Sequence, residues 1–329
     1  MSVVGQLGAA LLVALLLIAC TCSSDSEQNN TKRTQIVPDA GISEVKPPSG
    51  QVPSGEPAAP TTLFLPDAEA EWLIPESTNA ARRDCPAEMV AVSAEFCIDR
   101  YEATLRDVRR NREISPFYHP TLTQSASSFR RWQKKRFTMG IPQYQEIPVP
   151  PIPPFQITER FQIKAVVKGG VSPQGYMSGV LARQACENAG KRLCTETEWV
   201  TACRGELDRD FPYGDTYERG TCNVQNGAHP AKILHGHASL GHLDPRLNAF
   251  AYLGRPLLHA TGTNPRCVSR WGDDAVYDMV GNIDEWIDDE EGAFVGGFYA
   301  RNTQAGCGAK IVVHPPKYFD YSLGVRCCL

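Results

Sequence analysis

The sequence lacks three features that would each point to a particular class of protein. It has no apolar run of about 17 to 25 residues, the length that a membrane-spanning helix needs. It has no excess of positive charge, because its net charge is -4 over 329 residues, and this balance favours no polyanionic partner. It has no paired C-x-x-C spacing of the kind that forms zinc sites. These absences argue against a helical membrane protein, a nucleic-acid-binding protein and a zinc-ribbon protein.

Cysteine, by contrast, is abundant. Twelve cysteines are too many for a reduced cytosol in the absence of a metal motif, and oxidation to disulfides is the simpler account. An apolar content of 42% and a charged content of 21% are ordinary for a soluble domain. Once a leader and a polar tether are set aside, the length suits one globular domain of about 250 residues. We therefore expect a single disulfide-containing domain in an oxidising compartment.

The N-terminal residues support export. An unbroken small and apolar run of 13 residues, Leu7 to Ala19, leads directly into Cys20. The segment Leu17-Ile18-Ala19-Cys20 resembles the lipobox of bacterial lipoproteins, in which the cysteine after the cleavage site is acylated. The resemblance implies that residues 1–19 are a signal peptide and that a lipid on Cys20 anchors the protein to a membrane of the bacterial cell envelope. Residues 1–6 contain no Lys or Arg, although a leader normally begins with positive charge.

The next part of the chain is polar. From Thr21 to about Pro60 it is rich in Ser, Asn, Gln, Pro and Gly and has few large apolar residues. Such a composition cannot bury enough apolar surface to offset the entropy lost on ordering. We predict a disordered, lipidated tether over residues 20–70 and a folded domain over residues 71–329.

A basic and proline-rich insertion interrupts the predicted domain at about residues 106–174. Its prolines, densest from Ile147 to Pro154, argue against a helix or a central strand there. Its cations would suggest nucleic acid in an intracellular protein, but export argues against that partner and we expect none. An anionic glycan or a lipid headgroup is the alternative to a simply solvated insertion. The cations are Arg109, Arg110, Arg112, Arg130, Arg131, Lys134, Lys135 and Arg136.

Two helices are expected in close succession. The segment Ser178–Ala189 places apolar side chains near helical spacing and ends at Gly190, a good helix stop. Thr195-Glu196-Thr197-Glu198 has the capping-box pattern and opens a second helix that runs to Gly205. Beyond it the composition predicts long loops and short strands rather than further helices. We predict an α+β fold with two short helices and loop-rich strands, stapled by disulfides.

Six further segments stand out: Cys97–Thr104, Ala189–Trp199, Phe211–Asp215, Tyr277–Trp286, Val295–Gly297 and Leu323–Cys327. They resemble the motifs of one family, the formylglycine-generating enzyme or sulfatase-modifying-factor domain, whose fold is a variant of the C-type lectin fold. They occur in the family's order and cover the domain apart from the insertion, and agreement at all six is not expected by chance. The resemblance implies that this chain has the same fold.

The enzyme of that family oxidises a substrate cysteine to formylglycine. The resemblance implies that an active member has two cysteines, five positions apart, that bind copper, because thiolates suit Cu(I). Counted from Gly296-Gly297, the family's serine position is Phe298 and its first copper-ligand position is Arg301. Cys307 fits the structural cysteine that follows the pair. Both copper ligands are missing on this alignment, so we expect no copper site.

The same resemblance implies two disulfides, Cys186 with Cys327 and Cys203 with Cys307. Cys85 and Cys97 are expected to close a short hairpin near the start of the domain. Ten cysteines of the domain form five pairs with none spare, which favours scaffold bridges over reactive thiols. The sequence does not decide how the last four pair, and our assignment is Cys222 with Cys267 and Cys194 with Cys328.

Asn282 and Glu285 match positions that hold a calcium ion in the family. Calcium is a hard cation, so a carboxylate, an amide oxygen and nearby carbonyls would suit it. The alternative is an acidic, solvated loop, because Asp284 and the acidic run from Asp288 to Glu291 surround them. The sequence leaves both interpretations open.

Two functions are compatible with these features. The first is a non-catalytic binding or structural module at the cell envelope, a pseudoenzyme whose rigid frame presents loops to an envelope protein or glycan. The second is a formylglycine-generating oxidase, or sulfatase-modifying enzyme, that works through Cys307. A thiol count separates them, because a free Cys307 favours chemistry and a Cys203–Cys307 disulfide favours the module.

The lipobox makes a direct prediction. In a bacterial host, intact-mass analysis should find a mature protein that begins at Cys20 and carries acyl chains, and the protein should fractionate with membranes. Cys20→Ala should abolish both the added mass and the membrane retention, since it removes the acceptor sulfur. Membrane retention of Cys20→Ala at the wild-type level would contradict the lipid anchor.

Overall fold

The computed structural model describes residues 84–225 and 227–329. The predicted signal peptide over residues 1–19, Cys20 and the tether over residues 20–70 lie outside the described residues. Within the described ranges, no helix combines the length and the apolarity needed to cross a bilayer.

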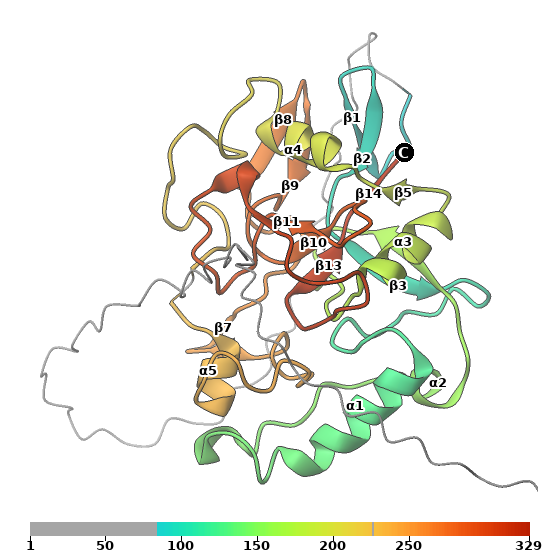
Figure 1. Ribbon diagram of the computed structural model, residues 1–329, viewed down its shortest axis with the longest axis vertical. Coiled ribbons are helices and arrows are strands. Elements are labelled where there is room, and N and C mark those ends of the chain that lie inside the picture. The colour runs from blue at the N-terminus through green and yellow to red at the C-terminus, as the bar shows by residue number, and fades with distance from the viewer. Residues whose placement is uncertain (1–83, 226) are drawn as a thin grey trace, which may run out of the picture. The chain divides into compact units, whose positions relative to one another are not determined.

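The first sheet joins the beginning of the described chain to its last strand. β1 (Met89–Val92) and β2 (Phe96–Asp99) form an antiparallel hairpin in which every strand residue is buried. β14 (Cys327–Cys328) pairs with β2 on one side and with β5 (Arg192–Leu193) on the other, so the strand order is β1-β2-β14-β5. Three distant parts of the sequence therefore meet at β14 (Figure 1).

The second sheet has the order β12-β11-β10-β13. Its strands are β10 (Asp284–Trp286), β11 (Phe294–Val295), β12 (Lys310–Ile311) and β13 (Leu323–Val325), and only the β10–β13 pair is parallel. Trp286 is 1% exposed and donates from Nε1 to the carbonyl of Met177 at 3.0 Å. Burial of β10 brings the carboxylates of Asp284 and Glu285 into the interior, where both need partners.

Three two-stranded sheets complete the β-structure of the described residues. β3 (Ala103–Asp107) pairs with β4 (Ile163–Val167), β6 (Ala251–Tyr252) with β7 (Arg255–Pro256), and β8 (Val268–Trp271) with β9 (Asp274–Tyr277). β4 lies inside the stretch that the sequence marked as an insertion, yet its register with β3 is continuous. Part of residues 106–174 is therefore built into the strands of the fold.

The two helices predicted from the sequence are confirmed. α3 (Gly179–Glu187) begins after Ser178, whose side chain accepts a hydrogen bond from the backbone of Leu181. α4 (Glu196–Arg204) begins with the complete capping box between Thr195 and Glu198 and ends at a glycine. Both helices start where a side-chain oxygen satisfies a free backbone N–H.

The prediction of only two helices was wrong. The longest helix, α1 (Leu122–Lys135), lies in the insertion, and the shorter α2 (Pro154–Thr158) and α5 (Pro230–His235) were also missed (Figure 1). Short 3-10 turns occur at η1 (Pro142–Tyr144) and η2 (Gly306–Gly308). In α2 and α5 a proline stands in the first turn, where its missing N–H has no helical partner to lose. Pro154 therefore opens a helix, although it lies in the segment whose prolines were used to argue against one.

The proline-rich segment before α2 is irregular, as predicted, but it is fastened to the domain. The hydroxyl of Tyr118 donates to the carbonyl of Pro150 at 2.7 Å, and that of Ser115 donates to the carbonyl of Pro151 at 3.2 Å. Gln156 accepts from the backbone N–H of Ser115 at 2.9 Å. Proline has no backbone N–H, but its carbonyl still accepts hydrogen bonds. These contacts therefore hold the segment in place although it is not paired as a β-strand.

Five disulfides tie these elements together, in the pairs expected from the sequence. Cys186–Cys327 joins α3 to β14, Cys203–Cys307 joins α4 to η2, and Cys85–Cys97 closes the first hairpin. The two pairs that the sequence left undecided are Cys194–Cys328 and Cys222–Cys267, as assigned.

The disulfides are expected to differ in their effect on stability. Cys186 and Cys327 are separated by 141 residues and Cys85 and Cys97 by 12. In the chain-entropy model, replacing the first pair by alanines should lower the free energy of unfolding by about 2 kcal/mol more than replacing the second. Guanidinium unfolding of the two double variants measures this difference, and equal losses would contradict the model.

Candidate functional site

A buried ion pair lies between the second sheet and β14. The guanidinium of Arg326 donates to both oxygens of Glu285, with Nη2 to Oε1 at 2.8 Å and Nε to Oε2 at 3.0 Å, and the two side chains are 0% and 1% exposed. Trp199 donates to the same carboxylate from Nε1 at 2.6 Å. The remaining Arg326 donors reach the carbonyls of Asp99 at 2.9 Å and Tyr277 at 2.8 Å. Both charges are therefore fully hydrogen-bonded within the protein.

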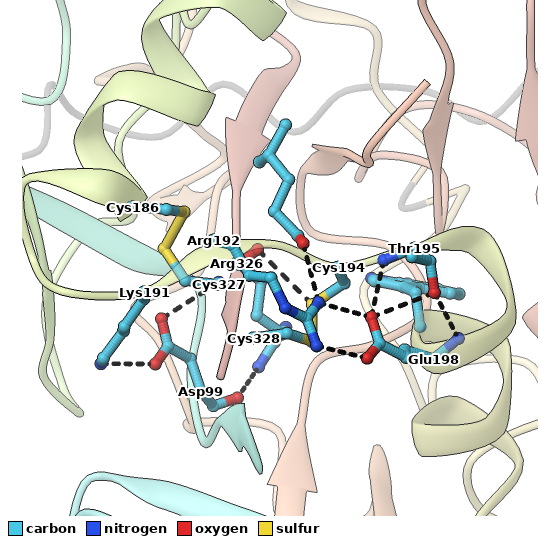
Figure 2. The surroundings of a disulfide bond; sticks show 12 residues. Asp99, Cys186, Lys191, Arg192, Cys194, Thr195, Glu198, Arg326, Cys327 and Cys328 are labelled. Carbon is cyan, nitrogen blue, oxygen red and sulfur yellow. Dashed lines mark hydrogen bonds and ion pairs between the residues drawn. A yellow bond between two sulfur atoms is a disulfide. The ribbon is translucent and has the colours of Figure 1, made fainter. Parts of the chain in front are cut away.

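Asp99 lies beside Arg326 and near the two disulfides of β14, as Figure 2 shows. Its Oδ1 accepts from Lys191 Nζ at 2.7 Å, and its Oδ2 accepts from the backbone N–H of Cys327 at 3.1 Å. Burial raises the pKa of Asp99 to about 6, although Lys191 and the hydrogen bonds lower it. Asp99 therefore connects β2, the turn before β5, and β14.

The side chains predicted to hold calcium are already engaged within the protein. Asn282 Oδ1 accepts from Asn223 Nδ2 and from the backbone N–H of His259, both at 2.9 Å, and its Nδ2 donates to Glu102 Oε2 at 2.8 Å. Both oxygens of Glu285 lie in the buried ion pair. Over residues 84–225 and 227–329, no three His, Cys, Asp or Glu side chains form a group that could hold a metal ion. This arrangement does not fit calcium, which would bind there only if the ion pair opened.

Cys307, the candidate catalytic residue, is bonded to Cys203 of α4 and is 1% exposed. All ten cysteines in the described part of the chain lie in disulfides. A nucleophilic or copper-binding cysteine acts as its thiolate. The described ranges therefore present no thiolate in this state.

Arg301, at the position that the resemblance aligns with the first copper ligand, is held by a second ion pair. Its Nη1 lies 2.8 Å from Asp284 Oδ1, and its guanidinium lies 5.0 Å from the ring centroid of Phe298. Arg301 is 34% exposed, whereas Asp284 is 1% exposed. Burial raises the pKa of Asp284 to about 6, and Arg301 opposes that shift. A guanidinium donates hydrogen bonds and has no lone pair for a metal, so this position suits an anion rather than copper.

Aromatic side chains extend the surroundings of Arg301. The ring of Phe298 meets Tyr321 edge-on, with centroids 5.7 Å apart, and meets His229 in the same way at 6.1 Å. The hydroxyl of Tyr318 donates to Asp320 Oδ2 at 2.7 Å. Rings, a half-exposed cation and buried carboxylates can recognise a ligand by charge and by contact with ring faces.

The sequence of most of the chain matches one family model. The model is that of the sulfatase-modifying factor enzyme 1-like domain, and it matches residues 49–328. The chain belongs to this family. The family model spans α1 and β4 as well as the six motif segments. No curated protein sequence matches the chain.

Solved structures give weaker likenesses to this sulfatase-modifying-factor domain. The structure titled "Crystal Structure of CarF" is 15% identical, with 71% of this chain and 85% of that chain covered and a TM-score of 0.33. "Structure of PvdO from Pseudomonas aeruginosa" is 12% identical, with 75% and 99% covered and a TM-score of 0.33. "Treponema denticola variable protein 1" is 18% identical, with 42% and 46% covered and a TM-score of 0.24. At these scores the likenesses add no argument to the family assignment.

Two ion pairs of the site were missed by the sequence analysis. Arg326 appeared only as a motif residue. Glu285 was assigned to calcium, because a carboxylate can bind either a calcium ion or a guanidinium. The two residues are 41 positions apart, and nothing local in the sequence signals their contact. Arg301 was noted for what it replaces, but its partner Asp284 was counted only among the acidic surroundings.

The raised pKa of Asp284 predicts a pH dependence of stability. Because the pKa of Asp284 is about 6 in the folded state and 3.8 for an unperturbed aspartate, protonation of Asp284 favours the folded state. This contribution is complete below about pH 4 and is lost as the pH rises through about 6, on the order of 3 kcal/mol in total. Asp284→Asn should therefore become more stable relative to wild type by that order as the pH rises from 4 to 7. Chemical unfolding across this range tests it, and a constant difference between the two proteins would refute it.

Proposed function

We propose that the protein is an envelope-anchored lipoprotein whose sulfatase-modifying-factor-like domain is a non-catalytic binding or structural module. The observation that supports this most is the disulfide between Cys307 and Cys203. The oxidase alternative depends on Cys307, because both copper-ligand positions of the family lack cysteine. A disulfide sulfur is neither a nucleophile nor a good copper ligand.

The surroundings of Arg301 support the same proposal. A copper oxidase of the family's kind would need two soft thiolates, the first of them at position 301. This chain has an arginine there, and Arg301 forms an ion pair with Asp284. A cation of this sort, bordered by the ring of Phe298, suits reversible recognition of an anionic or polar group.

The scaffold also suits a binding module. Disulfides join α3 to β14 and α4 to η2, so the loops between these elements are presented from a fixed frame. Such loops can vary in sequence without loss of the core, which is how one fold comes to serve many ligands. The ligand that we propose is an envelope protein or a glycan.

A thiol count tests the proposal against the oxidase alternative. The unreduced, denatured full-length protein is treated with iodoacetamide, and its peptides from residues 84–329 are analysed by mass spectrometry. We expect no label on Cys203 or Cys307. The Cys203→Ala variant is the positive control, because it frees Cys307 and should show label there.

A Cu(I) titration provides an independent measurement. In a variant with Cys20→Ala and Cys22→Ala, every remaining cysteine lies in the described residues and is paired, so we expect no stoichiometric, high-affinity binding. Labelled Cys307 in the wild-type protein, or one tightly bound Cu(I) per chain of this variant, would contradict the binding module and favour the oxidase.

A further inference from the structure

A cavity of about 300 Å³ lies against the β3–β4 hairpin. Besides these two strands, the segment from Glu113 to Phe117 and the residues from Lys168 to Ser172 contribute to its lining. The lining shares no residue with the ion pairs of Arg326 and Arg301 or with the disulfides. Pockets that hold small molecules have volumes of about 300 to 1,000 Å³, so this cavity is large enough for a small ligand.

The lining is mainly apolar, with charge at its exposed part. Its apolar members are Leu105, Ile114, Pro116, Phe117, Val166 and Val171, and its polar members are Thr104, Arg106, Glu113, Lys168 and Ser172. Two of them are exposed, Glu113 and Lys168, and both are charged. A cavity of about 150 Å³ is enough for a benzene ring, so this volume suits an apolar body of about two fused rings.

Backbone hydrogen bonds hold the walls of the cavity in place. Thr261, which is 1% exposed, donates from its hydroxyl to the carbonyl of Lys168 at 2.6 Å and from its backbone N–H to the carbonyl of Val171 at 2.8 Å. On another wall, the carbonyl of Pro116 accepts from the backbone N–H of Gly175 at 3.0 Å. The cavity is therefore formed before any ligand arrives, which lowers the entropy lost on binding.

The charges of the lining favour an anion. Arg106 Nη2 lies 2.8 Å from Glu113 Oε1, so these two charges compensate each other. Over residues 84–225 and 227–329, Lys168 forms no ion pair with a carboxylate. Two cations and one carboxylate leave the lining with one positive charge, and the hydroxyl of Ser172 adds a hydrogen-bond donor.

We propose that this cavity binds a small aromatic carboxylate, with its rings among the apolar side chains and its carboxylate beside Lys168. The ring of Phe117 lies in the lining and suits contact with a flat apolar ligand. The proposal goes beyond the proposed function, because it concerns a small-molecule site that includes neither Cys307 nor Arg301.

The test uses the full-length chain with Cys20→Ala, so that no lipid anchor takes up the apolar probe. Titration calorimetry with naphthoate, a carboxylate on two fused rings, should show one molecule bound per chain. Naphthamide has nearly the same shape and no charge. It should bind about fivefold more weakly, the size expected for an ion pair with an exposed lysine.

Lys168→Ala tests the charged part of the site. It should weaken naphthoate binding by about fivefold and leave naphthamide binding unchanged, because only the carboxylate uses the ammonium group. Lys168→Arg keeps the charge and should restore naphthoate binding. Lys134→Ala removes an exposed lysine outside the cavity and should bind both probes like the unmodified chain.

Val166→Trp tests the apolar part. It fills the cavity without a change of charge, and it should weaken the binding of both probes by at least about tenfold. Val313→Trp makes the same change at a position that is 75% exposed and outside the cavity, and it should leave both affinities unchanged. Circular dichroism and thermal unfolding confirm that each variant is folded.

Several results would overturn the proposal. These are no binding of naphthoate, equal affinity for naphthoate and naphthamide, equal losses for Lys134→Ala and Lys168→Ala, and full binding by Val166→Trp. None of these results bears on the thiol count, so this proposal and the non-catalytic function can fail separately.

Discussion

The ion pair between Arg326 and Glu285 determines how the parts of the domain meet. Taking two charges out of water costs several kcal/mol for each ion, and the cost is offset only where every hydrogen-bonding group finds a partner. Here the carboxylate of Glu285 accepts a hydrogen bond from Trp199 of α4. The guanidinium of Arg326 donates to backbone carbonyls of β2 and β9. Any shift of one of these elements would leave a buried charge short of a partner. The motif residues of the sulfatase-modifying-factor family around this pair therefore serve the architecture of the domain.

β14 is the second point on which the domain depends. Successive residues of a strand point to opposite faces, so Cys327 and Cys328 are directed to different partners. One is bonded to Cys186 in α3 and the other to Cys194, just before α4. Asp99 adds a hydrogen bond to the same strand (Figure 2). A strand of two residues is thus held on both faces and along both edges, which compensates for its short ladder.

The sequence predicted those features that have a local or a family signal. The capping box at Thr195 placed the start of α4, and the family motifs gave the fold and two disulfides. α1 was missed because its cations and the later prolines suggested a solvated segment. Its N-cap residue, Thr121, makes no capping hydrogen bond with its side chain. The partner of Glu285 could not be found, because a contact across 41 residues follows from packing of the two sheets.

The position of β14 in the chain has a consequence for biogenesis. Cys186 and Cys194 emerge from the ribosome 141 and 134 residues before their partners. During that interval both thiols are free to react with one another or with Cys203, and such early bridges would have to be exchanged before the native pairs could form. The two native bonds to β14 can therefore close only after this strand has been synthesised, so the interval between each cysteine and its partner is built into the order of the chain.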